Sequence, residues 1–356
     1  MSFRRMSPRR VLTFVVVVCL TVGALATVVG AREPVTITLI THDSFNVSKS
    51  VLRAFTRSTG IKVRVLRAGD AGQVLNQAIL TKDHPLADVL YGVDNTYLSR
   101  GLNNAIFEPY KAKALDTVPA EYLLDARHRA TPIDRSYVCV NDDKRWFADH
   151  NLARPTSLGD LTLPEYRGLL VVENPATSST GLPFLLATIA EFGEAEAGGG
   201  GWRDYWSRLR ANDVLVVDGW EQAWYEHFTA GAENGDRPLV VSYASSPPAT
   251  VNKAGTNARA GTLLKSCFEQ VEFAGVLRGT EHPSAARDLI DFMLSKRFQE
   301  DVPGQMYVFP VRDDVELPAE FARFVEVPSD PLALASDLID ENRDRWIREW
   351  TETVLR

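Results

Sequence analysis

Residues 168–192 read GLLVVENPATSSTGLPFLLATIAEF: an apolar strand-like stretch, a turn of small hydroxyl residues and an apolar helical stretch. This order is typical of a strand that turns directly into a helix, the repeating unit of α/β proteins. The turn at 174–182 predicts unpaired backbone N–H groups beside hydroxyls at the positive end of a helix dipole, which suits an anion. The alternative is an ordinary helix cap, because Ser and Thr are common N-cap residues.

The same alternation of strands and helices extends along the chain in two series. The first has strands at 35–41, 62–66 and 87–92, with helices at 48–59 and 73–81. The second follows a strand at 136–141 and has strands at 168–173, 214–218 and 238–243, with a helix that begins at 182. A strand at 271–277 leads back, and helices at 284–300 and about 332–354 end the chain. We therefore expect an α/β fold with two lobes, each a mixed, mostly parallel sheet flanked by helices. The glycine-rich residues 194–201 are expected to be a flexible connection.

The amino terminus indicates export. Residues 4–10 hold four arginines, an uncharged apolar segment follows at 11–30, and residues 29–31 supply the small side chains that signal peptidase reads. We expect a signal peptide at 1–31 and a mature protein in the periplasm or another extracytoplasmic space. The alternative is an uncleaved membrane tether, because the segment is close to the ~20 residues that span a bilayer.

Charge and cysteine content narrow the possible partners. The formal net charge is −7, and removal of the signal peptide takes away four arginines. Because Lys and Arg are also scattered, we expect no nucleic-acid partner. Cys139 and Cys267 remain in the mature chain, and in an exported protein two cysteines most simply form one disulfide. The histidines show no pair at metal-ligand spacing, so no metal site is expected.

Ligands of open α/β sheets bind beyond the carboxyl ends of strands, which makes the residues there the candidates for a binding site. They include the carboxylates Asp43, Asp70 and Asp94, the aromatic residues Trp220, Tyr243 and Tyr307, and the serine turn. Aromatic faces suit a flat ring, carboxylates suit a positive charge, and the serine turn suits an anionic end. The pattern therefore indicates a flat cation with a polar tail. The alternative is structural: core aromatics, and helix caps at Asp43 and Asp94.

Six segments resemble, in order and near spacing, the thiamine-binding proteins of bacterial ABC importers. They are HDSF at 42–45, ADVLYGVDN at 87–95, NPATSSTGL at 174–182, DGWEQAW at 218–224, VVSYASSP at 240–247 and YVFPV at 307–311. The resemblance implies a type II periplasmic-binding-protein fold, with lobe one at 32–137 plus 270–356, lobe two at 138–269, and two crossing strands. It implies no cofactor, but thiamine or a thiamine phosphate as ligand between the lobes. The implied partners are a membrane permease and its ATPase, with the receptor a monomer.

The same resemblance assigns roles to single residues. Asp70 matches the family's acidic residue before the second helix, Ser178 and Gly181 match its phosphate loop, and Trp220 and Tyr243 match its ring-stacking aromatics. The expected ligand-binding set also includes Asp43, Asp94, Ser245 and Tyr307. The chain departs from the family where His42 replaces a tyrosine, Tyr307 replaces a tryptophan, and Pro248 and Ala249 stand where a tyrosine follows the SP motif. These replacements reduce the aromatic area available for stacking on a ligand. The choice among thiamine, its phosphates and another heteroaromatic cation therefore stays open.

Two classes of function fit this resemblance. The first is a solute receptor without catalytic activity. The second is an enzyme similar to thiaminase I, which uses a cysteine nucleophile on a similar scaffold. Cys139 shares a strand face with Tyr137 and Asn141 and so could face a cleft, but a disulfide with Cys267 would remove its thiolate. We therefore expect the receptor.

Overall fold

The computed structural model describes residues 35–194 and 200–356. The expected signal peptide at 1–31 and most of the expected connection at 194–201 lie outside the described residues. Among the helices that are described, none is both long and apolar enough to cross a membrane.

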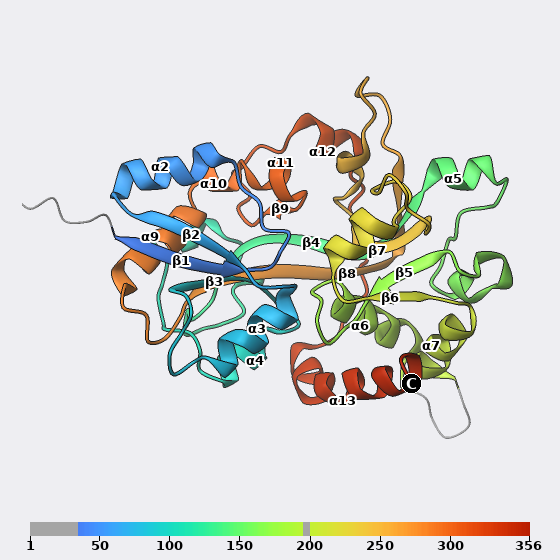
Figure 1. Cartoon of the computed structure of the whole chain (residues 1–356), viewed down its shortest axis with the longest axis horizontal. Helices are drawn as coiled ribbons and strands as arrows, with labels where there is room; N and C mark the ends of the chain where they lie inside the picture. The colour runs from blue at the N-terminus through green and yellow to red at the C-terminus, as the bar shows by residue number, and fades with distance from the viewer. Residues whose placement is uncertain (1–34, 195–199) are drawn as a thin grey trace, which may run out of the picture. The chain divides into compact units, whose positions relative to one another are not determined.

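One mixed sheet in the order β2-β1-β3-β8-β4-β7-β5-β6, with β9 paired to β4, contains all the described strands (Figure 1). They are β1 (Thr36–Thr41), β2 (Lys62–Arg67), β3 (Val89–Asp94), β4 (Thr131–Asp143), β5 (Leu170–Glu173), β6 (Leu215–Val217), β7 (Leu239–Tyr243), β8 (Ala260–Val276) and β9 (Phe309–Pro310). β1 pairs in parallel with β2 and β3, and β5 pairs in parallel with β6 and β7. We call the β1–β3 end of the sheet the first lobe and the β5–β7 end the second lobe.

The long antiparallel strands β4 and β8 join the two lobes. They pair with each other from Thr131 opposite Ala274 to Asp143 opposite Ala260. β3 pairs with the last part of β8, whereas β7 pairs with the second half of β4. Each lobe is therefore built onto a different end of the same strand pair, which gives the two crossing strands that we expected.

The helices flank this sheet, and local sequence signals set several of their ends. They are α2 (Lys49–Thr59), α3 (Ala71–Leu80), α4 (Leu98–Asn103), α5 (Lys144–Asp149), α6 (Gly181–Phe192), α7 (Gly201–Ala211), α8 (Trp220–Gln222), α9 (Pro283–Met293), α10 (Lys296–Gln299), α11 (Val302–Met306), α12 (Ala319–Phe324) and α13 (Ser336–Val354). α2 ends where Gly60 adopts a φ of 76°, a left-handed conformation that glycine adopts without a steric penalty. The prediction of a single helix at 284–300 is wrong. The backbone of Ser295 is extended, and its side chain caps the separate helix α10.

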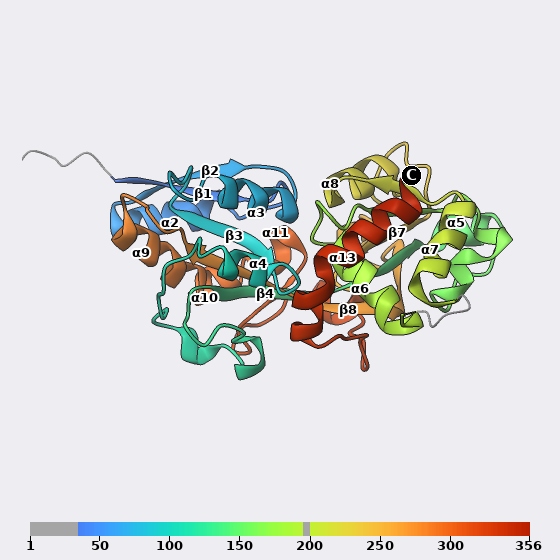
Figure 2. The ribbon, with the colours of Figure 1, turned by 90° about the horizontal axis from the view of Figure 1, so that it is seen from below.

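The C-terminal helix α13 packs against α7 of the second lobe, as Figure 2 shows from below. The rings of Trp206 and Trp350, both fully buried, meet edge to face with centroids 5.4 Å apart. The sequence-based boundaries put this helix in the first lobe, because residues 270–356 were expected to belong to that lobe. In the structure, the aromatic residues of this helix pack on α7.

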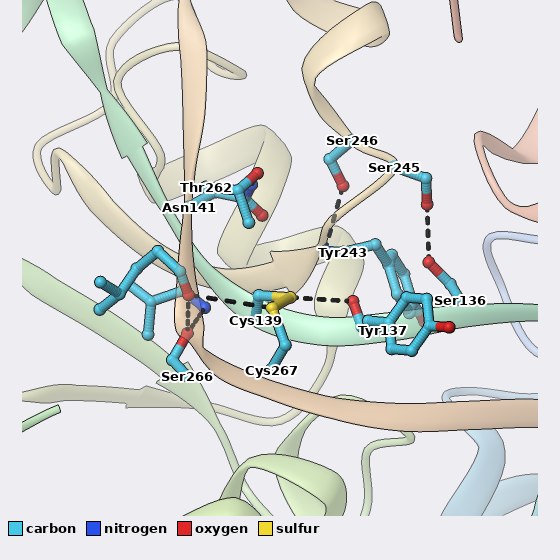
Figure 3. Close-up of a disulfide and its surroundings, with 12 residues drawn as sticks. Ser136, Tyr137, Cys139, Asn141, Tyr243, Ser245, Ser246, Thr262, Ser266 and Cys267 are labelled. Atoms are coloured by element: carbon cyan, nitrogen blue, oxygen red, sulfur yellow. Dashed lines mark hydrogen bonds between the residues drawn. A yellow bond between two sulfur atoms is a disulfide. The ribbon is translucent and has the colours of Figure 1, made fainter. Parts of the chain in front are cut away.

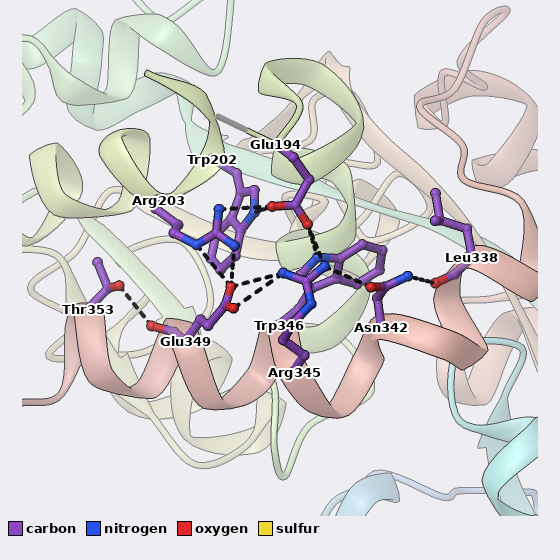
Figure 4. Close-up of polar contacts among 9 residues, drawn as sticks. All are labelled: Glu194, Trp202, Arg203, Leu338, Asn342, Arg345, Trp346, Glu349 and Thr353. Carbon is purple, nitrogen blue, oxygen red and sulfur yellow. Dashed lines mark hydrogen bonds and ion pairs between the residues drawn. The ribbon is translucent and has the colours of Figure 1, made fainter. Parts of the chain in front are cut away.

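A network of hydrogen bonds and ion pairs connects α13 to Glu194 and to α7 (Figure 4). Glu194 accepts hydrogen bonds from Arg345 at 2.7 Å and from the Trp346 indole at 2.5 Å, and it pairs with Arg203 at 2.8 Å. Burial alone would raise the pKa of Glu194, but these donors lower it to about 2. The other side of α13 reaches the first lobe, where buried Arg343 donates to the Thr96 carbonyl at 3.1 Å. α13 therefore contacts both lobes.

Cys139 of β4 and Cys267 of β8 form a disulfide, with Cα atoms 4.2 Å apart (Figure 3). Both residues are fully buried. The regular pairing of β4 with β8 shifts between Val138 and Val140, where the Val140 N–H donates to the Ser266 hydroxyl at 2.8 Å. The covalent bond therefore joins the crossing strands at an irregularity of their hydrogen-bond ladder.

Loss of this disulfide should destabilise the protein without changing its fold. A crosslink that closes a loop of 128 residues restricts the unfolded chain, and such bonds typically contribute about 2–4 kcal/mol. Urea unfolding with and without a thiol reductant measures the difference. The double variant Cys139→Ala, Cys267→Ala is the control, since reductant should not shift its midpoint. Equal midpoints for the oxidised and reduced native protein would contradict the assignment.

Candidate functional site

A cavity of about 370 Å³ lies between the lobes, beyond the carboxyl ends of β1 and β7. Its volume falls within the range of about 300–1,000 Å³ that is typical of small-molecule sites. We call it the aromatic cavity. Its lining residues are His42, Asp43, Ser44, Phe45, Asn46, Arg67, Trp220, Glu221, Tyr225, Tyr243, Glu272, Gln305, Met306, Tyr307 and Val308.

A second cavity of about 190 Å³ adjoins the first, and we call it the acidic cavity. The two share Asp43, Ser44, Trp220 and Glu221, and the acidic cavity adds Asp70, Gln73, Asp218, Gly219 and Gln222. Four carboxylates therefore line it, and its lining includes no Lys, Arg or His. Burial, followed by the nearby charge of Asp43, raises the pKa of Glu221. The joint site favours a positively charged group.

Trp220 is the central aromatic residue of the site. Its indole N–H donates to the Ser242 hydroxyl at 2.8 Å, and its ring stacks on Trp224 with a centroid distance of 5.6 Å. Its ring also meets that of Tyr225 edge to face and that of Tyr243 at a tilt of 42°. The rings of Trp220 and Tyr243 are therefore not parallel, and in this conformation they do not form two parallel faces for a flat group.

Tyr307 and Asp43 complete the expected residues of the aromatic cavity. Tyr307 follows α11 with a φ of 55°, a left-handed conformation that is uncommon for a residue other than glycine. Asp43 accepts a hydrogen bond from the Gly69 N–H at 3.1 Å, which fixes the loop after β1 to the loop after β2. Asp43 does not cap a helix, because α2 begins only at Lys49.

Asp70 lies at the start of α3 and connects the lobes. Its carboxylate accepts hydrogen bonds from the backbone N–H of Ala71 in its own lobe at 2.7 Å and of Trp220 in the second lobe at 3.0 Å. It also accepts from the N–H and the hydroxyl of Ser179, each at 3.3 Å. Asp70 lines the acidic cavity but not the aromatic cavity.

The serine turn at 174–182 lines neither cavity. Ser178 is fully buried, and its hydroxyl accepts from the N–H groups of Thr180 at 3.2 Å and Gly181 at 3.4 Å, where the chain enters α6. A Cβ at Gly181 would lie 2.6 Å from the Glu173 carbonyl, so only glycine fits there. Ser245 is also buried, and its hydroxyl bonds to that of Ser136 at 2.6 Å (Figure 3). These residues support the backbone around the cleft.

Asp94 is fully buried at the end of β3, away from both cavities. One of its carboxylate oxygens accepts from the N–H of Thr96 at 2.7 Å and from its hydroxyl at 2.5 Å, whereas the other has no partner. Burial raises the pKa of Asp94 to about 7, in spite of these two donors. Of the nine expected ligand-binding residues, Asp43, Trp220, Tyr243 and Tyr307 line the aromatic cavity and Asp70 lines the acidic cavity.

A buried polar cluster at the floor of the aromatic cavity was not predicted from the sequence. Glu272 of β8 lies 3.5 Å from the His42 imidazole and accepts from the Tyr91 hydroxyl at 3.1 Å; that hydroxyl also contacts Asp134. Despite burial, Glu272 raises the pKa of His42, and His42 lowers that of Glu272. Burial and the charge of Glu272 raise the pKa of Asp134. The sequence signal for this cluster was Glu272, the one charged residue in the apolar run at 271–277. A carboxylate buried in such a strand requires a polar partner.

Other lining residues, among them Glu221, Tyr225, Gln305 and Met306, were also missed. Glu221 lies within the tryptophan motif at 218–224 and Tyr225 directly follows it, and this position was the signal available for them. Within residues 35–194 and 200–356, no three His, Cys, Asp or Glu side chains lie close enough to hold a metal ion.

Comparison with protein families and curated proteins gives consistent matches. The family model of the bacterial extracellular solute-binding proteins matches residues 84–327. The chain is 27% identical to a thiamine-binding periplasmic protein of Escherichia coli, over 95% of this chain and 99% of the relative. A putative 2-aminoethylphosphonate-binding periplasmic protein of Salmonella paratyphi A is 24% identical, over 88% of this chain and 86% of that protein.

Solved structures match the fold. A periplasmic thiamin binding protein superposes with a TM-score of 0.80 at 24% identity, over 92% of this chain and 98% of that one. Iron-bound HitA from Pseudomonas aeruginosa superposes with a TM-score of 0.70 at 21% identity, over 90% and 99% of the two chains. These matches confirm the expected two-lobed type II fold.

Replacement of Asp94 should change how stability depends on pH. Its pKa is about 7 in the folded protein and 3.8 as the ordinary value, so the folded state holds more protons and its stability falls as pH rises through this window. Asp94→Asn removes that titration. The melting temperature of the variant relative to the native protein should therefore rise between about pH 4 and pH 7. The exposed Asp313→Asn is the control. A difference that does not vary with pH would show that Asp94 is ionised throughout.

Proposed function

The chain belongs to the bacterial extracellular solute-binding proteins, and from this premise we propose that it binds thiamine or a thiamine phosphate between its lobes. Membership in this family confirms the expected solute receptor outside the cytoplasm, which delivers a small molecule to a membrane permease. The observation that carries the thiamine proposal is that Trp220, three tyrosines and three carboxylates line one cavity.

Thiamine is a flat heteroaromatic cation, and the proposed site matches each part of it. The face of Trp220 that is not covered by Trp224 provides stacking area and attracts a positive ring. Asp43, Glu221 and Glu272 supply negative charge around that face. The two basic side chains of the lining are already engaged: His42 pairs with Glu272, and Arg67 donates to the carbonyls of Asp43 and Phe45.

We propose lobe boundaries close to those expected from the sequence, namely 137/138 and 269/270. In support, β4 pairs with β9 through Arg135 and with β7 from Val138, and β8 pairs with β3 from Glu272 onward. The proposal assigns α13 to the second lobe, because it packs on α7. Ligand binding then stabilises the contact between the lobes.

The proposal includes a monomeric receptor without catalytic activity that works with a permease and its ATPase. An enzyme similar to thiaminase I requires a cysteine thiolate in the cleft. Cys139 is bonded to Cys267, and both sulfur-bearing side chains are buried. This arrangement favours the receptor over the enzyme.

Titration calorimetry with thiamine tests the proposal. Trp220→Ala removes the stacking face and should weaken binding by about tenfold to a hundredfold, the equivalent of roughly 1–3 kcal/mol. Trp146→Ala is the control, because Trp146 lies on α5 outside both cavities. No thiamine binding by the native protein would refute the proposed function. Unchanged thiamine affinity in Trp220→Ala would refute only the placement of the ring.

A further inference from the structure

The aromatic cavity has a buried carboxylate in its lining. Among the described residues that line it, three are acidic: Asp43 and Glu221 are exposed, whereas Glu272 is 7% exposed. Charges act on one another most strongly where solvent is excluded and screening is weak. At equal distance, the charge of Glu272 therefore acts on a ligand in this cavity more strongly than that of either exposed carboxylate.

His42 lies beside this carboxylate, with its Nε2 atom 3.5 Å from an oxygen of Glu272. His42 is 6% exposed, and its Nε2 atom forms no hydrogen bond within the described part of the chain. The separation exceeds the distance of about 3 Å that is typical of an N–H···O hydrogen bond. The two side chains therefore interact through charge, and a competing cation has no hydrogen bond between them to break.

Other contacts hold the His42 ring in this position. Its Nδ1 atom lies 2.9 Å from the Ser44 hydroxyl oxygen, and its ring meets that of Tyr91 with centroids 5.4 Å apart. The backbone at Gly92 has a φ of 95°, and a Cβ there would overlap the His42 ring. Only glycine therefore leaves room for the ring next to Glu272.

Further carboxylates from three elements surround this pair. Asp43 and Asp70, in the loops after β1 and β2, add to the effect of Glu272 in raising the pKa of His42. Asp134 lies opposite Glu272 in the pairing of β4 with β8, and burial and the charge of Glu272 raise its pKa. Glu272, rather than Asp134, therefore carries the negative charge at the floor of the cavity. In the second lobe, the charge of His42 lowers the pKa of Glu221, although burial raises it overall.

The remaining charged or titratable neighbours narrow the source of a proton that is exchanged near pH 7. The hydroxyls of Tyr91 and Tyr243 stay neutral, because burial raises their pKa values well above 10.0. Arg67 is always charged, and it donates to backbone carbonyls. The pKa of His42 is raised from 6.5, and that of Asp94, which also feels the charge of Glu272, is about 7. A proton exchanged near pH 7 therefore comes from His42 or from Asp94.

The buried carboxylate requires one positive charge beside it, and two sources meet in the cleft. Without a ligand, the proton on His42 compensates the charge of Glu272. A heteroaromatic cation that binds in the cavity brings a second positive charge to the same carboxylate, and the two positive charges repel each other. The quaternary ring nitrogen of thiamine cannot lose its charge, whereas His42 can lose its proton to the solvent.

We propose that a ligand cation and the proton of His42 compete for Glu272, so that binding of the cation releases a proton from His42. The inference deepens the proposed function and rests on it, since it takes thiamine as the cation. Linkage is reciprocal: if binding releases a proton, the affinity for the cation rises with pH. His42 thereby couples capture of the solute to the pH outside the cytoplasm.

Titration calorimetry with thiamine near pH 7, in buffers of different ionisation enthalpy, counts the protons that are released. The native protein should release up to about one proton per thiamine bound, and its affinity should rise by up to about tenfold per pH unit. The rise should end above the pKa of His42 in the free protein, which lies above 6.5. His42→Gln removes the titration, so it should release no proton and bind thiamine with an affinity that does not vary with pH.

His84→Gln is the matched control, because His84 is an exposed histidine outside both cavities. It should release as many protons as the native protein. A second measurement needs no variant and serves if His42→Gln does not fold: an NMR titration of the His42 ring, with and without saturating thiamine. The pKa of His42 should fall when thiamine binds.

The outcomes separate this inference from the proposed function. Thiamine binding without proton release, or with proton uptake, would overturn the inference and leave the proposed function intact. Release that persists in His42→Gln would also overturn it and would assign the proton to Asp94. Failure of the native protein to bind thiamine would instead refute the proposed function.

Discussion

The pairing of β4 with β8 is the constraint on which the rest of the structure depends. These strands form the centre of the sheet, and each lobe adds its parallel strands to a different end of the pair. The cavity residues from the first lobe therefore face those from the second across a connection of two strands. The disulfide between Cys139 and Cys267 fixes the relative position of these strands. The buried side chain of Glu272, on β8, supplies a negative charge to the floor of the cleft.

Much of the fold could be predicted because its signals are local. Apolar runs ended by polar residues predict strands, and Gly60 and Asp70 mark the end of one helix and the start of another. The rule that ligands bind beyond strand ends is geometric, and it brought Asp43, Trp220 and Tyr243 together correctly in one cavity. The helix at 284–300 failed as a prediction because its break depends on one serine that caps the helix after it, and serine also occurs within helices.

The chemistry of the site was harder to predict because it depends on partners that are distant in sequence. Glu272 and His42 lie on different strands, and their effects on each other's pKa exist only after folding. Ser178 has the same composition signal whether it binds an anion or caps a helix. Asp70, which lies more than a hundred residues earlier, reaches the same turn from the opposite lobe and accepts a hydrogen bond from the Ser179 N–H. A motif shows which donors a loop carries, but not whether the rest of the chain has already used them.

The two-sided contact of α13 restricts how the lobes can move. The helix packs through Trp350 on the second lobe and is hydrogen-bonded through Arg343 to the first, so it forms a third link beside β4 and β8. A rigid rotation that preserves all three links must have its axis close to them. Displacement in such a rotation grows with distance from the axis, so contacts near α13 change little. The lobes are therefore held together on the side of α13 as well as along the two central strands.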